Sequence, residues 1–397
     1  MSELITGIGE LTTQADEDAT AGDPRNRTTE AALVVEDGRI AWIGPAVHAP
    51  AADTRVDVGG RAVLPGWVDT HTHLVFAGDR SAEFEARMAG ERYAAGGIAT
   101  TMAATRAASE QQLVANATHL RREAQAGGTT FLEAKTGYGL DVESEARSAR
   151  AAAAVADVVT FLGAHVVPPG VARRDYIDLV TGPMLAAVAP YASYIDVFCE
   201  TGAFDVEESR EVLLAGRAAG LGLRVHGNQL GESGGVQLAV ELGAASVDHC
   251  NALSDQDVAA LASSDTVATL LPATDLSTRE PLAPGRRLLD AGAAIALATN
   301  CNPGTSYTTS MAYCVATAVL QMHLTIAEAV WAATRGAARA VGREHGRDAI
   351  GSLRVGGIAD LQVLDAPSVA HLAYRPGVPL TLAVWRGGER QRPVPAL

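Results

Sequence analysis

Short apolar runs alternate with longer helical patterns through most of the chain. From residue 129 onward each apolar run is followed by a segment of helical periodicity, which is typical of parallel βα units. We expect strands at residues 130–134, 158–162, 195–199, 223–226, 246–249, 267–271 and 294–298. With one more strand leading into His71, the count approaches eight. This pattern predicts an α/β fold of the (β/α)₈ TIM-barrel type.

The two ends of the chain show a different pattern. Strand-like runs at residues 3–8, 31–35 and 40–43 come first, and the Asp-Gly pair at 37–38 between the last two predicts a hairpin. The polar segment 14–27 is expected to be a surface loop. Near the other end, residues 351–365 return to a strand pattern.

Helix signals separate the predicted strands. Residues 142–155 form an alanine-rich pattern that predicts a helix. Asp205 with Glu208, and Thr325 with Glu328, have the spacing of a capping box, so each pair predicts a helix start. The helix that begins after Thr325 is expected to end near Gly342.

Charge and composition exclude several classes of function. The 397 residues include 46 acidic and 31 basic ones, a formal net charge of −15, which repels nucleic acid and anionic membranes. No run approaches the ~18 apolar residues of a membrane helix, and the N-terminus lacks the pattern of a signal peptide. We therefore expect a cytoplasmic protein. Its four cysteines form no CxxC pair and are expected to be reduced thiols.

The stretch VLPGWVDTHTHLVFAGDR, residues 63–80, holds the most informative local chemistry. Val63-Leu64 and Trp67-Val68 are suited to a buried strand that leads into His71 and His73. Alternate side chains of an extended strand share a face, so both imidazoles can reach one metal ion. Taken alone, an HxH pair is as often structural as metal-binding.

The positions of further polar residues favour the metal reading. Five stand at or just after predicted strand ends: His73, His165, His226, His249 and Asn300. In a (β/α)₈ barrel the active site lies at the C-terminal ends of the strands. Histidine nitrogens are suitable ligands for zinc or iron(II), and His71, His73 and His226 can supply three.

Several motifs carry a family resemblance over nearly the whole chain. The PGWVDTHTH stretch resembles the amidohydrolase superfamily, and HTHLVFAGDR, KTGYGL, FLGAH, VHGNQL, VDHC and NPGTS resemble its imidazolonepropionase family. The resemblance implies a barrel over residues 63–350 beside a small β-sandwich built from residues 1–62 and 351–397. It also implies a homodimer with one zinc or iron ion. The implied substrate is 4-imidazolone-5-propanoate, a small molecule with a carboxylate tail. The implied reaction hydrolyses its cyclic amide to N-formimidoyl-L-glutamate.

The resemblance assigns the metal site to His71, His73, His226 and position 300. The family has aspartate at that last position, whereas this chain has Asn300. An aspartate both binds the metal and accepts a proton from the bound water, while an amide offers only a neutral oxygen. This departure predicts impaired activity, unless another group serves as the base. Because every neighbouring motif is intact, an inactivating change in an otherwise normal enzyme is favoured over a natural loss of activity.

Other roles also follow from the resemblance. His249 matches a histidine beside the metal that activates water or polarises the carbonyl, so His249 and Asn300 are the candidate catalytic residues. Lys135 could suggest the carbamylated lysine of two-metal relatives, but the KTGYGL context assigns it a structural role. The implied substrate-binding residues are Arg80, which suits a carboxylate, with Tyr93, Tyr138, His165, Gln229, Asn302, Gly304 and Thr305.

Two other functions remain open at this point. One is an amidohydrolase that acts on a different heterocycle, such as a deaminase of a base, although Arg80 would then have no carboxylate to bind. The other is a catalytically silent member that binds its ligand without turnover, which Asn300 alone favours.

Overall fold

The computed structural model describes residues 1–15, 21–23, 26–90 and 97–391. Its contacts divide the chain into two compact units. One unit contains residues 1–69, 122–131 and 310–397, and the other contains residues 70–121 and 132–309. All the candidate site residues that the structure describes belong to the second unit.

An eight-stranded sheet forms the barrel that the sequence predicts. Its order is β12-β11-β10-β9-β8-β7-β6-β5, and the paired strands from β6 to β12 run parallel. The strands are β5 (Trp67–Asp69), β6 (Thr129–Lys135), β7 (Val158–Ala164), β8 (Tyr194–Cys199), β9 (Gly222–Gly227), β10 (Ser246–His249), β11 (Val267–Leu270) and β12 (Ile295–Leu297). Thr72 forms a parallel bridge with Asn300, which brings the segments after β5 and β12 together.

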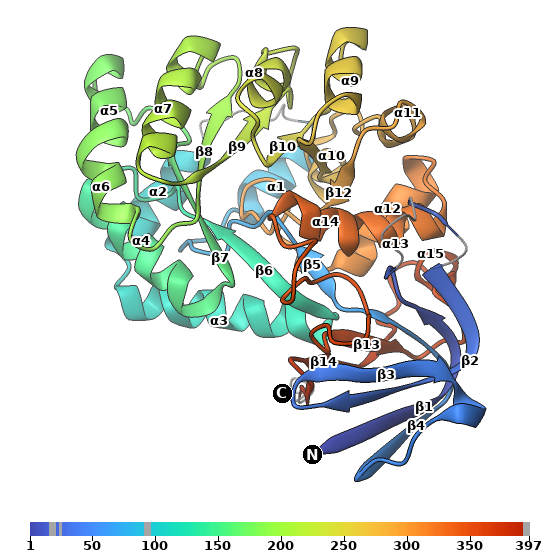
Figure 1. The fold of residues 1–397 in the computed structure, drawn as a ribbon. Helices are drawn as coiled ribbons and strands as arrows, with labels where there is room; N and C mark the ends of the chain where they lie inside the picture. The colour runs from blue at the N-terminus through green and yellow to red at the C-terminus, as the bar shows by residue number, and fades with distance from the viewer. Residues whose placement is uncertain (16–20, 24–25, 91–96, 392–397) are drawn as a thin grey trace. The chain divides into compact units, whose positions relative to one another are not determined.

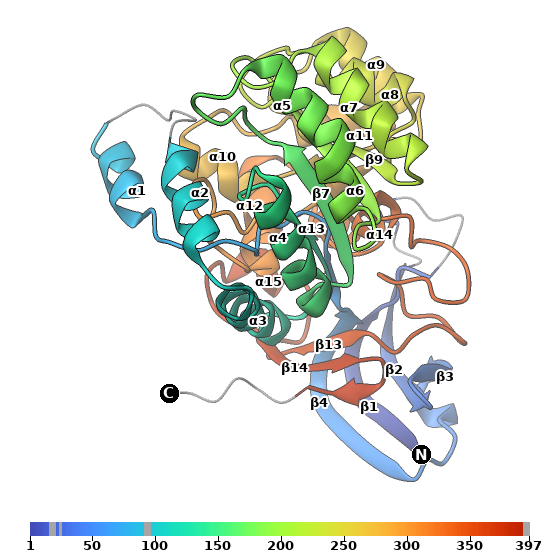
Figure 2. The same cartoon turned by 90° about the vertical axis from the view of Figure 1, so that its left-hand side faces the viewer.

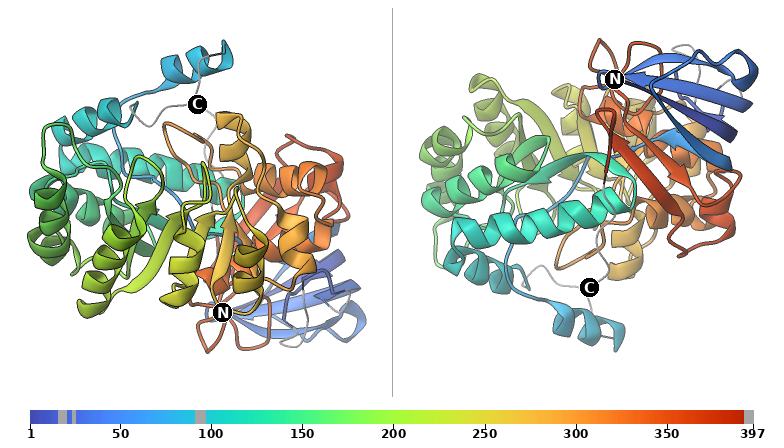
Figure 3. Two further views of the ribbon diagram at one scale, coloured as in Figure 1. Left: turned by 90° about the horizontal axis from the view of Figure 1, so that it is seen from above. Right: turned by 90° about the horizontal axis from the view of Figure 1, so that it is seen from below.

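Helices lie outside these strands, as Figures 1 and 3 show for the green and gold segments. Those before β6 are α1 (Ser81–Met88), α2 (Ile98–Ala107) and α3 (Glu110–Ala126). Those between β6 and β12 are α4 (Val142–Val155), α5 (Arg173–Leu179), η4 (Val180–Met184), α6 (Leu185–Val188), α7 (Val206–Ala218), α8 (Gly235–Glu241), α9 (Asp255–Ala262), α10 (Pro272–Thr278) and α11 (Gly285–Asp290).

Capping explains where the predicted helices begin. The Asp205 side chain accepts from the Glu208 N–H at the start of α7, and the reciprocal bond completes the capping box. Thr325 and Glu328 form the same box at the start of α13. Both predicted boxes are therefore confirmed. Such a box stabilises a helix start because it pairs backbone N–H groups that the first turn leaves without a partner.

A seven-stranded sheet combines both ends of the chain (Figure 2). Its order is β15-β14-β13-β4-β1-β2-β3, with β1 (Ser2–Thr12), β2 (Arg27–Glu36), β3 (Arg39–Pro45), β4 (Thr54–Pro65), β13 (Leu361–Leu364), β14 (Thr381–Arg386) and β15 (Glu389–Arg390). Asp37 and Gly38 both have positive φ in the turn between the antiparallel strands β2 and β3. The predicted hairpin is thus confirmed, since a type I′ turn needs that conformation. Side chains from the strands of this sheet, among them Ile5, Leu33 and Trp385, form a buried apolar cluster.

The remaining elements are short helices of the first unit, η2 (Ala46–His48), α12 (Met311–Gln321), α13 (Ile326–Ala332), α14 (Arg335–Ala340) and α15 (His371–Tyr374). Part of the predicted loop at 14–27, residues 16–20 and 24–25, lies outside the described residues. Among the described residues no helix is both long and apolar enough to cross a membrane. The four cysteines are buried free thiols, as predicted.

Three boundaries differ from the sequence prediction. Val63 and Leu64 belong to β4 of the seven-stranded sheet, and the chain passes Gly66 before it enters the barrel at Trp67. The single helix expected up to Gly342 is two helices, because Thr334 leaves the helical region at φ −126° and ψ −91°. Within 351–365 only β13 is a strand.

Candidate active site

The predicted histidines meet where the barrel strands end. His71 and His73 follow β5, His165 follows β7, and His226 and His249 lie in the last two positions of β9 and β10. The centroids of the His71 and His226 rings are 4.5 Å apart, and those of His73 and His165 are 5.6 Å apart. The structure therefore gathers five imidazoles into one buried cluster.

One ring nitrogen, His73 Nε2, lies close to the same nitrogen of two other rings, and His71, His226 and His249 each offer a ligand nitrogen within 4.8 Å of the others. His73 Nε2 lies 3.3 Å from His71 Nε2 and 3.4 Å from His226 Nε2. Three nitrogen ligands about 2.0–2.1 Å from a tetrahedrally coordinated ion are about 3.3–3.4 Å from one another. The spacing of these nitrogens thus fits a single metal ion.

The rings are held in the form that binds metals. His71 and His73 are fully buried, and burial, followed by neighbouring cationic groups, holds the pKa of each well below its ordinary value. Their imidazoles are therefore neutral near pH 7 and keep a nitrogen lone pair. A metal binds that lone pair, so this donor set fits a divalent ion such as zinc or iron(II).

Two buried aspartates fix which nitrogen is free. His71 Nδ1 donates to Asp248 Oδ2 over 2.6 Å, and His226 Nδ1 donates to Asp196 Oδ1 over 3.0 Å. An ionised carboxylate can only accept, so the proton stays on Nδ1 and Nε2 points into the cluster. Burial alone would raise the pKa of Asp248, but Arg224, His71 and Lys135 outweigh burial and hold that pKa well below the ordinary range.

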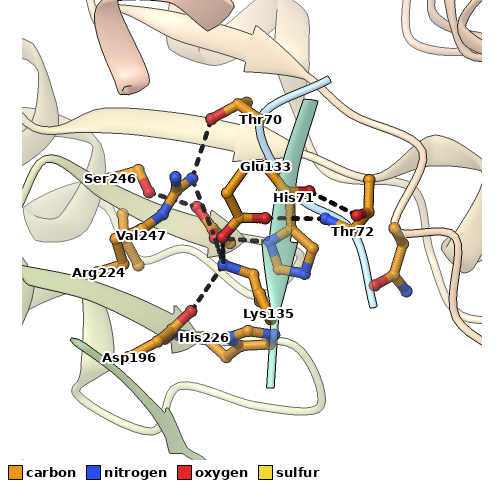
Figure 4. Close-up of polar contacts among 12 residues, drawn as sticks. Thr70, His71, Thr72, Glu133, Lys135, Asp196, Arg224, His226, Ser246 and Val247 are labelled. Atoms are coloured by element: carbon orange, nitrogen blue, oxygen red, sulfur yellow. Dashed lines mark hydrogen bonds and ion pairs between the residues drawn. The ribbon is translucent and has the colours of Figure 1, made fainter. Parts of the chain in front are cut away.

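A layer of charged side chains lies among the strands next to the histidines (Figure 4). Lys135 is completely buried, with its Nζ 2.9 Å from both Glu133 Oε1 and Asp196 Oδ2. Arg224 is equally buried and donates to Thr70 Oγ1 over 3.1 Å. Because every ion in this layer has an opposite partner, the buried charge is tolerated.

His249 lies beside the three convergent rings. Its ring centroid is 5.4 Å from that of His226 and 5.9 Å from that of His71. Burial, followed by the neighbouring His226, lowers the pKa of His249 to about 3, so its imidazole is neutral at physiological pH. Its neighbour in sequence, Asp248, contacts His71, and the buried Nδ1 of His249 has no hydrogen-bond partner among the described residues.

The Asn300 backbone is hydrogen-bonded to the backbones of His71 and His73, and its side chain is held through the amide nitrogen. Nδ2 donates to Thr274 Oγ1 over 2.7 Å and to Thr305 Oγ1 over 2.9 Å. Its Oδ1 is buried and has no hydrogen-bond partner among the described residues. The backbone has φ +68°, which asparagine tolerates better than most residues. The geometry leaves the oxygen of Asn300 as its only atom able to serve as a ligand.

A pocket adjoins the histidine cluster and collects most of the predicted substrate-binding residues. Arg80, Tyr138, His165, Asn302 and Thr305 line it. Its apolar walls include Ile98, Val166, Phe198 and Leu230. A mostly apolar pocket with a few converging polar groups suits a small polar molecule.

Arg80 already holds a carboxylate inside the protein. Its Nε and Nη2 donate to the two Glu83 oxygens over 2.8 and 2.7 Å. A Cβ added to Gly304 would lie only 2.0 Å from Arg80 Nη1, so Gly304 gives the guanidinium room. Arg87, which also contacts Glu83, donates to the Gly304 carbonyl over 2.8 Å. A second carboxylate would therefore have to approach the Nη1 edge.

Two predicted residues stand apart from the pocket lining, and one cannot be placed. The backbone N–H of Gln229 donates to the buried carboxylate of Glu200 over 2.9 Å, and Gln229 is not among the lining residues. Gly304 contributes through its contact with Arg80 and is likewise not among them. Tyr93 lies outside the described residues.

The sequence interpretation missed the acidic residues that support the site. Asp196 and Asp248 orient two histidines, and Glu83 anchors Arg80. Glu145, which is buried in α4, accepts hydrogen bonds from the backbone of the loop that carries Tyr138. Asp196 and Asp248 could have been predicted, because each lies inside a predicted barrel strand. A charged residue in such a strand is buried and needs a polar or oppositely charged partner.

Comparison with known proteins finds similar sequences over nearly the whole chain. The profile of the Amidohydrolase family matches residues 62–394. The imidazolonepropionase of Saccharopolyspora erythraea is 66% identical over 389 residues, which cover 98% of each chain. That of Arthrobacter sp. (strain FB24) is 63% identical over 407 residues, with 99% of this chain and 100% of the relative covered.

Solved structures share the fold at low sequence identity. An adenosine deaminase from Xanthomonas campestris with bound zinc has a TM-score of 0.70 at 18% identity, covering 98% of this chain and 92% of the other. The N-isopropylammelide isopropylaminohydrolase from Burkholderia multivorans has a TM-score of 0.71 at 19% identity, covering 98% of both.

Proposed function

The chain belongs to the amidohydrolase family, and we propose that it hydrolyses the cyclic amide C–N bond of 4-imidazolone-5-propanoate to N-formimidoyl-L-glutamate. Relatives at 66% and 63% identity over nearly the full length are named imidazolonepropionase. The observation that carries the proposal is that the histidine cluster and the pocket with Arg80 adjoin each other. In that cluster His73 Nε2 lies at metal-ligand spacing from the same nitrogen of His71 and of His226.

His71, His73 and His226 would hold one divalent ion, and Asn300 Oδ1 would be a fourth, neutral ligand. The bound metal would lower the pKa of a water molecule toward neutrality and polarise the amide carbonyl. The buried, neutral imidazoles support this assignment, as does the unpaired buried oxygen of Asn300. We propose zinc or iron, because both accept histidine ligands.

His249 would take the proton that the family aspartate takes. An amide has no basic lone pair, so Asn300 cannot accept a proton from water. His249 lies next to the proposed metal ligands, and its buried Nδ1 has no hydrogen-bond partner among the described residues, so position rather than basicity makes it the candidate proton acceptor. It would then pass the proton to the ring nitrogen of the substrate as the C–N bond breaks, so the proton count balances.

Arg80 would orient the substrate through its propanoate tail. The side chains of Tyr138, His165, Asn302 and Thr305 share the pocket with Arg80 and would hold the ring over the metal site. Tyr93, Gln229 and Gly304 complete the set that the family resemblance assigns. Fixing both ends of a small substrate brings its carbonyl into line with the attacking water.

The family also supports two proposals about the working form. We propose that the enzyme acts as a homodimer in the cytoplasm, with no nucleic-acid or membrane partner. Sedimentation equilibrium on the purified chain would test the dimer directly.

Arg80→Met tests the proposed substrate. Losing charged hydrogen bonds worth about 1.5–3 kcal/mol should raise KM for 4-imidazolone-5-propanoate by roughly 10- to 150-fold. The change in kcat should be smaller. The matched control is Arg150→Met, since Arg150 pairs with Glu110 on the helices outside the barrel and should leave both constants unchanged.

A neutral substrate sharpens this test. The methyl ester of the substrate should be a poor substrate for the natural chain, and Arg80→Met should remove most of the preference for the free acid. Equal use of acid and ester by the natural chain would contradict the role of Arg80. Absence of turnover with either compound would overturn the proposed reaction.

A further inference from the structure

Lys135 is the single lysine of a chain that otherwise uses 30 arginines for its basic side chains. It is the last residue of β6, and its side chain is completely buried. Burying an ammonium ion is expensive unless ionised partners surround it. A residue type that occurs once, in a costly place, calls for an explanation that an ordinary surface cation does not.

Three carboxylates converge on the Lys135 ammonium group. Its Nζ lies 2.9 Å from Glu133 Oε1, 2.9 Å from Asp196 Oδ2 and 3.6 Å from Asp248 Oδ2. All three acidic side chains are fully buried. Figure 4 shows the nitrogen of Lys135 at the centre of these contacts.

Two of the carboxylates lead to metal-ligand histidines. Asp196 uses its other oxygen, Oδ1, to accept from His226 Nδ1 and from the His226 backbone N–H over 3.2 Å. Asp248 accepts from His71 Nδ1 through Oδ2, the same oxygen that faces Lys135. Each aspartate thus joins the ammonium group to a different ligand.

The third carboxylate, Glu133, accepts a hydrogen bond from the backbone between His71 and His73. Glu133 Oε2 accepts from the Thr72 N–H over 3.0 Å, and Thr72 separates His71 from His73. The Lys135 backbone N–H also donates to the Thr72 carbonyl over 2.8 Å. The ammonium group is therefore connected through Asp248 to the His71 ring, through Asp196 to the His226 ring, and through Glu133 to the backbone that precedes His73.

We propose that Lys135 is a positioning residue: its ammonium group holds three carboxylates in place, and these carboxylates orient the three ligand histidines. The inference rests on the metal site of the proposed function. It goes beyond that function because it makes metal affinity depend on a residue that touches neither metal nor substrate.

The charge balance explains why a cation is needed. Glu133, Asp196 and Asp248 bring three negative charges, and Lys135 with Arg224 brings two positive ones, since Arg224 lies 3.6 Å from Asp248. Without Lys135 the three carboxylates would repel one another and reach for other donors. Each would then leave the position from which it fixes a histidine.

Shape explains why the cation is lysine. Lysine presents a compact charge with three donors on a flexible stem, whereas arginine presents a wide planar fork. Three carboxylates placed around one point match the three donors of an ammonium group. We therefore expect Lys135→Arg to fail although it keeps the charge.

The test compares metal binding by the natural chain with that by Lys135→Met and Lys135→Arg, using zinc and a competing chromophoric chelator. Losing such supporting contacts typically weakens metal binding 10- to 100-fold, and we expect at least a tenfold rise in the zinc Kd for both variants. The thermal unfolding of each metal-free protein is recorded as well. Arg121→Met is the matched control, because Arg121 pairs with Asp157 away from the site and should leave the zinc Kd unchanged.

Nitrogen-15 spectra of the histidines report which ring nitrogen carries the proton. This tautomer would not change if Lys135 only stabilised the fold. In the natural metal-free chain His71 and His226 should carry their proton on Nδ1, and in Lys135→Met these signals should change to mixed tautomers. A folded Lys135→Met variant with an unchanged zinc Kd would overturn the proposal. So would a Lys135→Arg variant that binds zinc like the natural chain.

The natural chain provides a second route if Lys135→Met does not fold. Labelling with [¹⁵Nζ]lysine gives one side-chain signal, because there is one lysine. The proposal expects that signal to be protected from solvent exchange and to shift when zinc binds, and an unshifted signal would overturn it. A natural chain that binds no zinc would instead overturn the metal site of the proposed function.

Discussion

At the scale of single residues, the ligand histidines could be predicted, but their partners could not. The HxH spacing and the strand-end positions pointed to His71, His73 and His226, because strand geometry is local. Asp248 contacts His71, which is 177 positions away. Such a pairing depends on how distant strands align, and no local pattern encodes it.

Asn300 shows the same limit. The sequence identifies the change from the family aspartate, but it does not say how the amide is turned. The amide nitrogen donates to the hydroxyls of Thr274 and Thr305, and the buried oxygen has no hydrogen-bond partner among the described residues. The fold therefore satisfies the amide nitrogen of asparagine at this position, and whether the site turns over substrate is left to the activity measurement.

A titratable residue near the site makes stability depend on pH. Asp275 in α10 is buried, and burial raises its pKa to about 7 against the hydrogen bonds from Asn251 and from the Ala283 N–H. Between pH 4 and 7 the folded chain then holds a proton that the unfolded chain has lost. The free energy of unfolding should fall as pH rises through this range.

Asp275→Asn should remove this dependence. At pH 8 the variant should be more stable than the natural chain by on the order of 2–4 kcal/mol, and at pH 4 the two should be alike. Urea unfolding at both pH values measures the difference. Equal stability at pH 8 would mean that Asp275 ionises normally in the folded chain.

At the scale of elements, local signals placed helix starts well. Helix α4 has the predicted bounds, and both capping boxes form, because caps and periodicity are properties of a few adjacent residues. The entry to the barrel was harder to predict. The apolar run at 63–68 serves two sheets, and which sheet each half joins is decided by pairing with distant strands.

The loop after β6 illustrates how an element positions a side chain. Glu145 accepts from the backbone N–H groups of Gly137, Gly139 and Leu140 over 3.1, 2.7 and 2.8 Å. These bonds surround Tyr138, which lines the pocket. Glutamine has a single acceptor oxygen, so Glu145→Gln would leave at least one buried N–H unpaired at a cost of about 1–3 kcal/mol.

We expect Glu145→Gln to raise KM by roughly 5- to 50-fold, with a smaller change in kcat, because the loop would no longer hold Tyr138 in place. Steady-state kinetics and thermal unfolding check this. Glu143→Gln is the control, since Glu143 is exposed on the same helix. An unchanged KM in a folded Glu145→Gln variant would refute the positioning role of the loop.

At the scale of the whole molecule, the barrel followed from the sequence because its strand pattern repeats. The parallel strands bring residues from β5 to β12 to one end, and the bridge between Thr72 and Asn300 joins the two ends of the series. Histidines far apart in sequence therefore meet without any local signal linking them. The charged layer around Lys135 could not be predicted, since it needs the register of four strands.

The most direct test of the central claim is turnover of 4-imidazolone-5-propanoate by the zinc- or iron-loaded chain, with metal content determined on every sample. The natural chain should form N-formimidoyl-L-glutamate and should lose this activity when the metal is removed. His249→Gln should lose about 10²- to 10⁴-fold in kcat with unchanged metal content. If the natural chain is inactive and only Asn300→Asp turns over, His249 is not the proton acceptor and this chain is a binding protein with a disabled hydrolase site.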